Sequence, residues 1–154
     1  MRAAAKSKMG KVNMNKEKYA EIELLFAEHV SNGVVLMGTA SRLAYEELRV
    51  AYCEGLYFSV ILQARILFSS MLMGVSTECH WCDAERRLEE LELSQEWGAL
   101  AREFLAISGR YLPGVNESDL SRELVARDME LPELIKIDAY RCMEIAITFL
   151  GGAR

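Results

Sequence analysis

Residues 79–82, Cys79-His80-Trp81-Cys82, form the part of the chain that most resembles a metal half-site. Zinc binds four Cys or His ligands in tetrahedral geometry, and two cysteines three positions apart commonly supply two of them. The other ligands are missing unless Cys53 or Cys142 comes close in space, or unless two chains complete the site together. An ordinary loop is the alternative interpretation. Cys79, His80 and Cys82 therefore form an incomplete metal candidate, and no cofactor is expected.

Arg65 stands near the middle of the most apolar stretch of the chain, residues 51–74. A guanidinium in such surroundings needs acceptors, because an unpaired buried charge is strongly destabilising. It is either a structural arginine, bonded to helix carbonyls or to a carboxylate such as Glu46 or Glu144, or it lines a cleft and binds a phosphate or carboxylate.

The same stretch is long enough to span a bilayer. Glu54 lies near its start, however, and Glu78 follows four residues beyond its end. Because Arg65 also falls at mid-segment, the pattern favours a central helix surrounded by other helices over a membrane span. No membrane association is expected.

The elements that must position these residues are helical. The chain has 154 residues, half of them hydrophobic, with only two prolines. We predict an all-α, single-domain bundle of five to seven helices over residues 15–152, preceded by a disordered basic tail, residues 1–14. The four cysteines lack the spacing of a disulfide scaffold, which favours a cytoplasmic location.

Charge is unevenly distributed along the chain. Residues 1–18 carry a net charge of +5, and the remainder carries −10. An acidic body argues against a domain that contacts nucleic acid over its whole surface, because phosphate contacts dominate such affinity. Any RNA contact would therefore involve a local arginine cluster or the tail lysines Lys6, Lys8 and Lys11. The alternative is that the tail only aids solubility.

Capping and breaking residues divide the body into helices. Asn15 is the predicted cap of the first helix, and a second helix is expected from about Val35 to Cys53. Gly55 marks a tight break, so the second and central helices should pack as an antiparallel pair. The residues expected on the buried side of the second helix are Leu36, Leu43, Leu48, Val50 and Tyr52.

The second half of the chain follows the same rules. Ser94 is the predicted cap of a helix that continues through Ile107, and Ser118 that of a short helix to about Met129. Pro132 suits the first turn of the last helix, which should end before Gly151. The apolar residues of that last helix are Leu134, Ile137, Tyr140, Ile145, Ile147 and Phe149.

The chain resembles the HEPN superfamily (higher eukaryotes and prokaryotes nucleotide-binding domains) over roughly residues 35–150. The resemblance rests on Ala51-x-x-x-Gly55-x-Tyr57, on the apolar helix with Arg65 inside it, and on the closing helix around residues 138–146. It implies a helical bundle that forms a homodimer through the central and fifth helices. It also places Arg102, Arg110 and Tyr111 where the family has its groove, as candidate nucleic-acid contacts.

The ribonucleases of that family carry an Arg followed, after four to six positions, by a His. Here Ser108 and Pro113 stand at the matching places, and neither His29 nor His80 has an Arg at the required distance upstream. Without an imidazole there is no obvious group for acid–base chemistry near neutral pH. The resemblance therefore implies a fold without the nuclease activity.

The first hypothesis is thus a non-catalytic, HEPN-like homodimeric subunit that binds a protein or RNA partner. Such proteins resemble components of toxin–antitoxin, phage-defence or RNA-guided immunity systems. The candidate contacts are Arg65, Arg102, Arg110, Tyr111, Lys6, Lys8 and Lys11. The alternative is a pure protein-interaction or assembly subunit whose acidic surface has no nucleic-acid role. A residual ribonuclease using Arg and Tyr is a third hypothesis, and no small-molecule substrate is evident.

Overall fold

A computed structural model of the chain describes residues 15–30, 38–73, 88–111 and 117–152. All regular secondary structure in these ranges is helical, so the predicted all-α bundle is confirmed. The helices are α1 (Lys16–His29), α2 (Thr39–Glu54), α3 (Tyr57–Met73), α5 (Gln95–Gly109), α6 (Glu117–Arg127) and α7 (Leu131–Leu150). The tail lysines and the Cys79–Cys82 segment lie outside the described residues.

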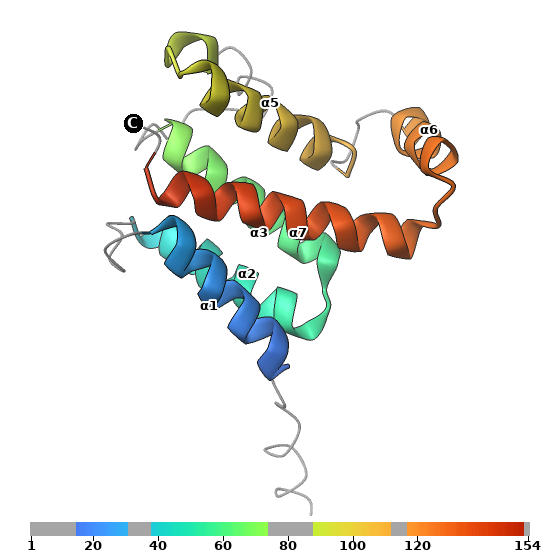
Figure 1. The fold of residues 1–154 in the computed structure, drawn as a ribbon, viewed down its shortest axis with the longest axis horizontal. Coiled ribbons are helices and arrows are strands. Elements are labelled where there is room, and N and C mark those ends of the chain that lie inside the picture. Colours follow the sequence, from blue (N-terminus) through green and yellow to red (C-terminus); the bar gives the residue numbers. More distant parts are fainter. Residues whose placement is uncertain (1–14, 31–37, 74–87, 112–116, 153–154) are drawn as a thin grey trace, which may run out of the picture.

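The two most central helices, α3 and α7, lie side by side (Figure 1). Helix α5 covers them on one side, and α1 and α2 cover them on the other. Helix α6 stands apart, beyond the N-terminal end of α7. Three phenylalanine rings meet in the core between these layers: Phe68 and Phe104 stack at 4.2 Å, and Phe149 meets Phe68 edge-on at 5.0 Å.

Local capping explains where several helices begin and end. The side chain of Asn15 accepts hydrogen bonds from the backbone of Glu17 and Lys18, and the Ser94 hydroxyl accepts one from Trp97, as predicted. Gly55 takes a left-handed conformation with φ of 75°, which glycine adopts at little cost. The Leu56 N–H bonds back to the Ala51 carbonyl at 2.8 Å, and this turn reverses the chain between α2 and α3.

Three sequence predictions need correction. Ser118 is the second residue of α6 and therefore not its cap, because the helix begins one residue earlier. Helix α2 begins at Thr39 rather than near Val35, and residues 31–37 are not described. Leu43 and Val50, expected to be buried, are both exposed. The apolar residues of α2 occupy two faces, and only the one with Ala44, Leu48 and Tyr52 meets other helices.

The central helix is also less enclosed than predicted. Ile61, Ala64 and Leu67 are buried, but Phe58 and Ile66 are 45% and 39% exposed on the opposite side. One face of α3 is therefore open, although most of its residues are apolar. Within the described residues, no helix combines the length and hydrophobicity needed to cross a membrane.

Candidate functional site

Arg65 points into the bundle, where α3 meets α5. Its side chain is 5% exposed, and its Nη1 donates to the hydroxyl of Ser108 at 2.6 Å. Ser108 is itself fully buried in the last turn of α5. The carboxylates suggested as partners form ion pairs with other arginines, Glu46 with Arg49 and Glu144 with Arg141.

A carboxylate on α7 receives the other candidate residues. Asp138 is 2% exposed, and one of its oxygens accepts hydrogen bonds from the Tyr111 hydroxyl at 2.6 Å and from Arg110 Nη1 at 3.2 Å. Arg110 also forms an ion pair with Glu123 of α6 at 3.7 Å. We call Arg65, Ser108, Arg110, Tyr111 and Asp138 the buried cluster.

Burial and neighbouring charges shift the pKa values of groups in and beside the buried cluster. Burial lowers the pKa of Arg65, and burial together with the hydrogen bond to Asp138 raises the pKa of Tyr111. The thiol of Cys142, also on α7, has its pKa raised by burial and by the charge of Asp138, while Arg110 and Arg65 act in the opposite sense. Both raised pKa values favour the protonated forms of Tyr111 and Cys142.

Four of the seven predicted contact residues lie in the described ranges, and the structure brings three of them together and separates the fourth. Arg65, Arg110 and Tyr111 lie in the buried cluster, where their polar atoms bond to other residues of the chain. Tyr111 is buried, so its ring offers little surface for stacking a base in this conformation. The cluster joins α3 to α5, and the end of α5 to α7, through hydrogen bonds, and Arg110 adds the ion pair to Glu123 of α6.

Arg102 lies elsewhere, exposed on α5, where it lines a groove of about 350 Å³ with Leu88, Glu89, Leu105 and Ala106. The tail residues Lys6, Lys8 and Lys11 and the metal candidates Cys79, His80 and Cys82 fall outside the described ranges. Within those ranges, no group of three or more His, Cys, Asp or Glu side chains is placed to hold a metal ion.

Asp138 is the residue that sequence reasoning missed. Leu134, Asp138 and Cys142 follow one another at four-residue steps and are all buried, so the carboxylate occupies the apolar face of α7. An acidic residue on such a face is a signal for a buried partner cation, in the same way that Arg65 signals one on α3.

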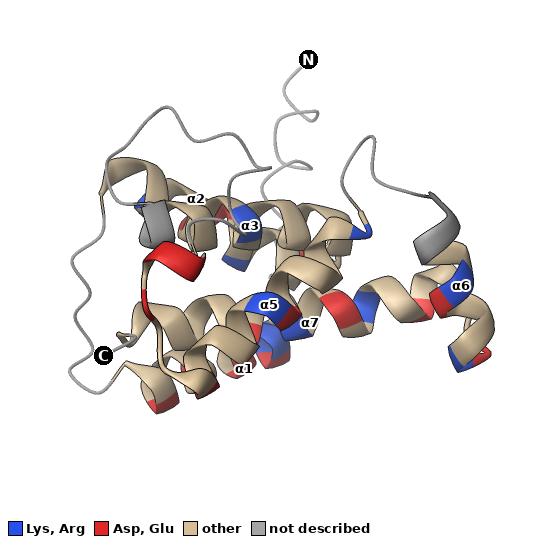
Figure 2. Cartoon of the chain, turned by 90° about the horizontal axis from the view of Figure 1, so that it is seen from above, with Lys and Arg blue, Asp and Glu red and all other residues tan. Residues whose placement is uncertain are grey.

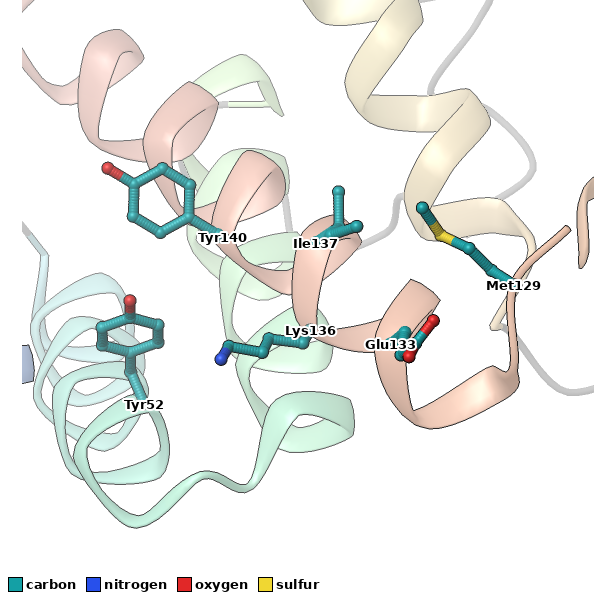
Figure 3. A pocket seen from close by; sticks show the side chains of 6 residues that line it. All are labelled: Tyr52, Met129, Glu133, Lys136, Ile137 and Tyr140. Atoms are coloured by element: carbon teal, nitrogen blue, oxygen red, sulfur yellow. The ribbon is translucent and has the colours of Figure 1, made fainter. Parts of the chain in front are cut away.

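A second feature is a groove of about 520 Å³ where the end of α2 faces the first half of α7 (Figure 3). The rings of Tyr52 and Tyr140 lie one above the other at 6.3 Å, and Ile137 and Met129 form the opposite end. Its remaining lining residues are Glu133 and Lys136. Ile137 and Tyr140, predicted as core residues of the last helix, are 44% and 37% exposed here.

Tyr52 of this groove and Tyr57 of α3 both contact Lys18 of α1. Lys18 Nζ lies 4.8 Å from the centroid of Tyr57 and 5.3 Å from that of Tyr52, and it donates to the Tyr57 hydroxyl at 2.8 Å. The Tyr52 hydroxyl donates to Glu21 at 2.5 Å. These contacts join the start of α1 to the α2–α3 turn and hold the Tyr52 side chain at the wall of the groove.

Comparison of the chain with protein-family models, with curated proteins and with solved structures found no match. The HEPN resemblance therefore stays a prediction from the sequence.

Proposed function

We propose that this protein is a non-catalytic, HEPN-like binding subunit that forms a homodimer and engages a protein partner. The proposal rests chiefly on the open face of α3. Phe58, Leu62 and Ile66, which we call the α3 stripe, follow one another at four-residue steps and are exposed or half-buried. Residues at this spacing share one face of a helix.

The α3 stripe suits contact with a second copy because it carries no charge. Arg65 is the one charged residue among the 17 of α3, and it is turned inward to Ser108. Most of the α3 ribbon is accordingly tan, whereas charges crowd α1, α6 and parts of α7 (Figure 2). A two-fold arrangement would bring the same stripe from both copies together without opposing like charges.

The expected affinity is modest. Burying a large apolar side chain completely is worth about 1.5–3 kcal/mol, so these partly exposed residues supply about 1 kcal/mol each. Six of them across a two-fold interface offset part of the association cost of about 4–15 kcal/mol. Neighbouring surface must supply the rest, and a dissociation constant in the micromolar range is expected.

A protein partner is favoured over RNA because many arginines of the body are already neutralised. Arg49, Arg110 and Arg141 all form ion pairs with carboxylates of the same chain. Phosphate binding there would have to displace these carboxylates. Of the predicted RNA contacts, Arg102 and the tail lysines Lys6, Lys8 and Lys11 are the ones left to the RNA alternative.

Sedimentation velocity of the full chain over a concentration series, about 1–200 µM, tests the dimer. We expect the 17.4 kDa monomer to give way to a dimer as concentration rises. Phe58→Glu and Ile66→Glu should remain monomeric with an unchanged helical circular dichroism spectrum. Val125→Glu, at an 82% exposed position on α6, is the matched control and should dimerise like the wild type. A monomeric wild type, or stripe variants that still dimerise, would contradict the proposal.

The RNA alternative is tested with a labelled RNA pool at about 50 and 200 mM salt, followed by denaturing gels. We expect neither retention nor cleavage. Salt-sensitive binding that is lost in Lys6→Glu/Lys8→Glu/Lys11→Glu would instead identify RNA as the partner. Cleavage that disappears in Arg110→Ala would show that the protein is catalytic.

A further inference from the structure

A groove of about 370 Å³ runs between α2 and α3 on the outside of the bundle. Its lining residues are Glu46, Glu47, Val50, Ala51, Leu56, Ser59 and Gln63. Two antiparallel helices leave such a furrow between them, and in a bundle a third helix usually fills it. We call this feature the α2–α3 groove.

Apolar side chains form the floor and one edge of the α2–α3 groove. Val50 and Leu56 are 50% and 51% exposed. Leu43, seven residues before Val50 and on the same face of α2, extends the apolar surface by two turns and is also exposed. Exposed large apolar residues gathered in this way mark interaction surfaces more often than scattered ones do.

The charged residues that line the groove are both acidic. Glu46 and Glu47 are exposed, and Glu54 continues the acidic series at the end of α2. Glu47 accepts a hydrogen bond from Gln63 at 2.5 Å, and Glu46 forms a long ion pair with Arg49 at 3.5 Å. These contacts hold the two carboxylates in place at the groove wall and leave oxygen lone pairs to accept further donors.

From this combination we infer that the α2–α3 groove binds an amphipathic helix of a protein partner, with an apolar stripe flanked by Lys or Arg. The apolar stripe would meet Leu43, Val50 and Leu56, and the basic flanks would meet the glutamates. Helix α2 has 16 residues, so a partner helix of similar length, about 24 Å, matches the groove. The inference rests on the proposed function, because it specifies the protein partner.

The α2–α3 groove and the α3 stripe adjoin on the surface of α3. Ser59 and Gln63 line the groove, and Phe58 and Leu62, one residue before each of them, are turned away by about 100°. Ile66, seven residues after Ser59, shares its face, so a second copy on the stripe and a partner helix in the groove would meet at Ile66.

The test measures fluorescence anisotropy of labelled peptides titrated with the full chain at about 150 mM salt. The first probe is a synthetic peptide of about 16 residues, with Leu on one helical face and Lys on both flanks. The second probe replaces every Lys by Glu. The third has the first composition in an order that removes the apolar face.

We expect the Lys-flanked peptide to bind and the other two to fail. Val50→Lys and Glu47→Lys should each weaken binding about tenfold or more, because one removes the apolar contact and both repel the basic flanks. Val125→Lys on α6 is the matched control and should bind like the wild type. Circular dichroism and the thermal midpoint show that each variant is folded.

Three results would overturn the inference: no binding to the wild type, equal binding of the Glu-flanked peptide, or equal binding by all variants. Sedimentation of the same variants separates this inference from the proposed homodimer. If Val50→Lys abolished the dimer and no peptide bound, the groove would belong to the interface between copies. If Phe58→Glu dimerised like the wild type while the Lys-flanked peptide bound only an intact groove, the α3 stripe would be refuted as the dimer interface and this inference would stand.

Discussion

Replacing Asp138 by Asn tests whether the buried cluster holds the helices together. The substitution keeps the size of the side chain and one acceptor oxygen but removes the negative charge. Arg110 then loses its buried ion-pair partner at 3.2 Å, and the Tyr111 hydroxyl loses a charged acceptor at 2.6 Å. Arg110 keeps the weaker contact with Glu123 at 3.7 Å.

The loss of stability can be bounded from these contacts. A hydrogen bond to a charged group is worth about 1.5–3 kcal/mol, and breaking a fully buried ion pair costs about 3–5 kcal/mol. Arg110 is 17% exposed and retains Glu123, so a value below the sum is expected. We predict that Asp138→Asn lowers the free energy of unfolding by about 2–3 kcal/mol, or the thermal midpoint by about 5–10 °C.

Urea denaturation followed by circular dichroism measures this value. Asp128→Asn is the matched control: Asp128 is exposed and has a φ of 50°, which Asn tolerates, so a change below about 0.5 kcal/mol is expected. Combining Asp138→Asn with Tyr111→Phe should cost about 1 kcal/mol less than the two single changes together. A negligible effect of Asp138→Asn, or strict additivity with Tyr111→Phe, would refute the reasoning.

Three further predictions follow from other contacts. A Cβ on Gly151 would lie 1.8 Å from the His29 carbonyl oxygen, so Gly151→Ala should lower the free energy of unfolding by about 1–3 kcal/mol in urea denaturation. The Cys142 thiol, fully buried and with a raised pKa, should react with a thiol reagent at pH 8 only when the chain unfolds. Burial raises the pKa of Tyr45 from 10 to about 12, so the unfolded chain ionises first and stability should fall between pH 10 and 12, by up to about 1.4 kcal/mol per pH unit for this group.

A specific result would contradict each of these three predictions. Gly98→Ala is the control, because inside α5 only a flexible arginine tip lies 3.6 Å from the new carbon, and it should stabilise the fold by up to about 1 kcal/mol. An equal loss of stability in both glycine variants would contradict the role of the close approach at Gly151. Rapid labelling of Cys142 in the folded chain, mapped by mass spectrometry, would contradict its burial. A free energy of unfolding that stayed constant or rose from pH 10 to 12 would contradict the shift at Tyr45.

Local signals explain which features could be predicted from the sequence. The caps at Asn15 and Ser94 and the break at Gly55 depend on side chains within a few residues of each helix end. Ser118 shows the limit of such signals, because several neighbouring polar residues there could begin a helix.

Long-range packing explains the errors. Whether Leu43 and Val50 face other helices depends on where α1 and α3 pack, which the spacing of apolar residues in α2 does not specify. Arg65 and Ser108 are 43 positions apart, so their pairing depends on how α3 and α5 cross. The groove lined by Tyr52 and Tyr140 likewise needs the end of α2 beside the first half of α7. The lone Asp138 on an apolar face was nevertheless visible in the sequence.

Oxidative cross-linking across the α3 stripe tests the proposed dimer most directly, because a two-fold interface can bring a residue near its own copy. Phe58→Cys, Leu62→Cys and Ile66→Cys would each be made in a chain carrying Cys79→Ser and Cys82→Ser, with Val125→Cys as the control. The proposal predicts a disulfide-linked dimer for at least one stripe variant under conditions in which the control stays monomeric. Equal cross-linking of the control, or none at any stripe position, would contradict it.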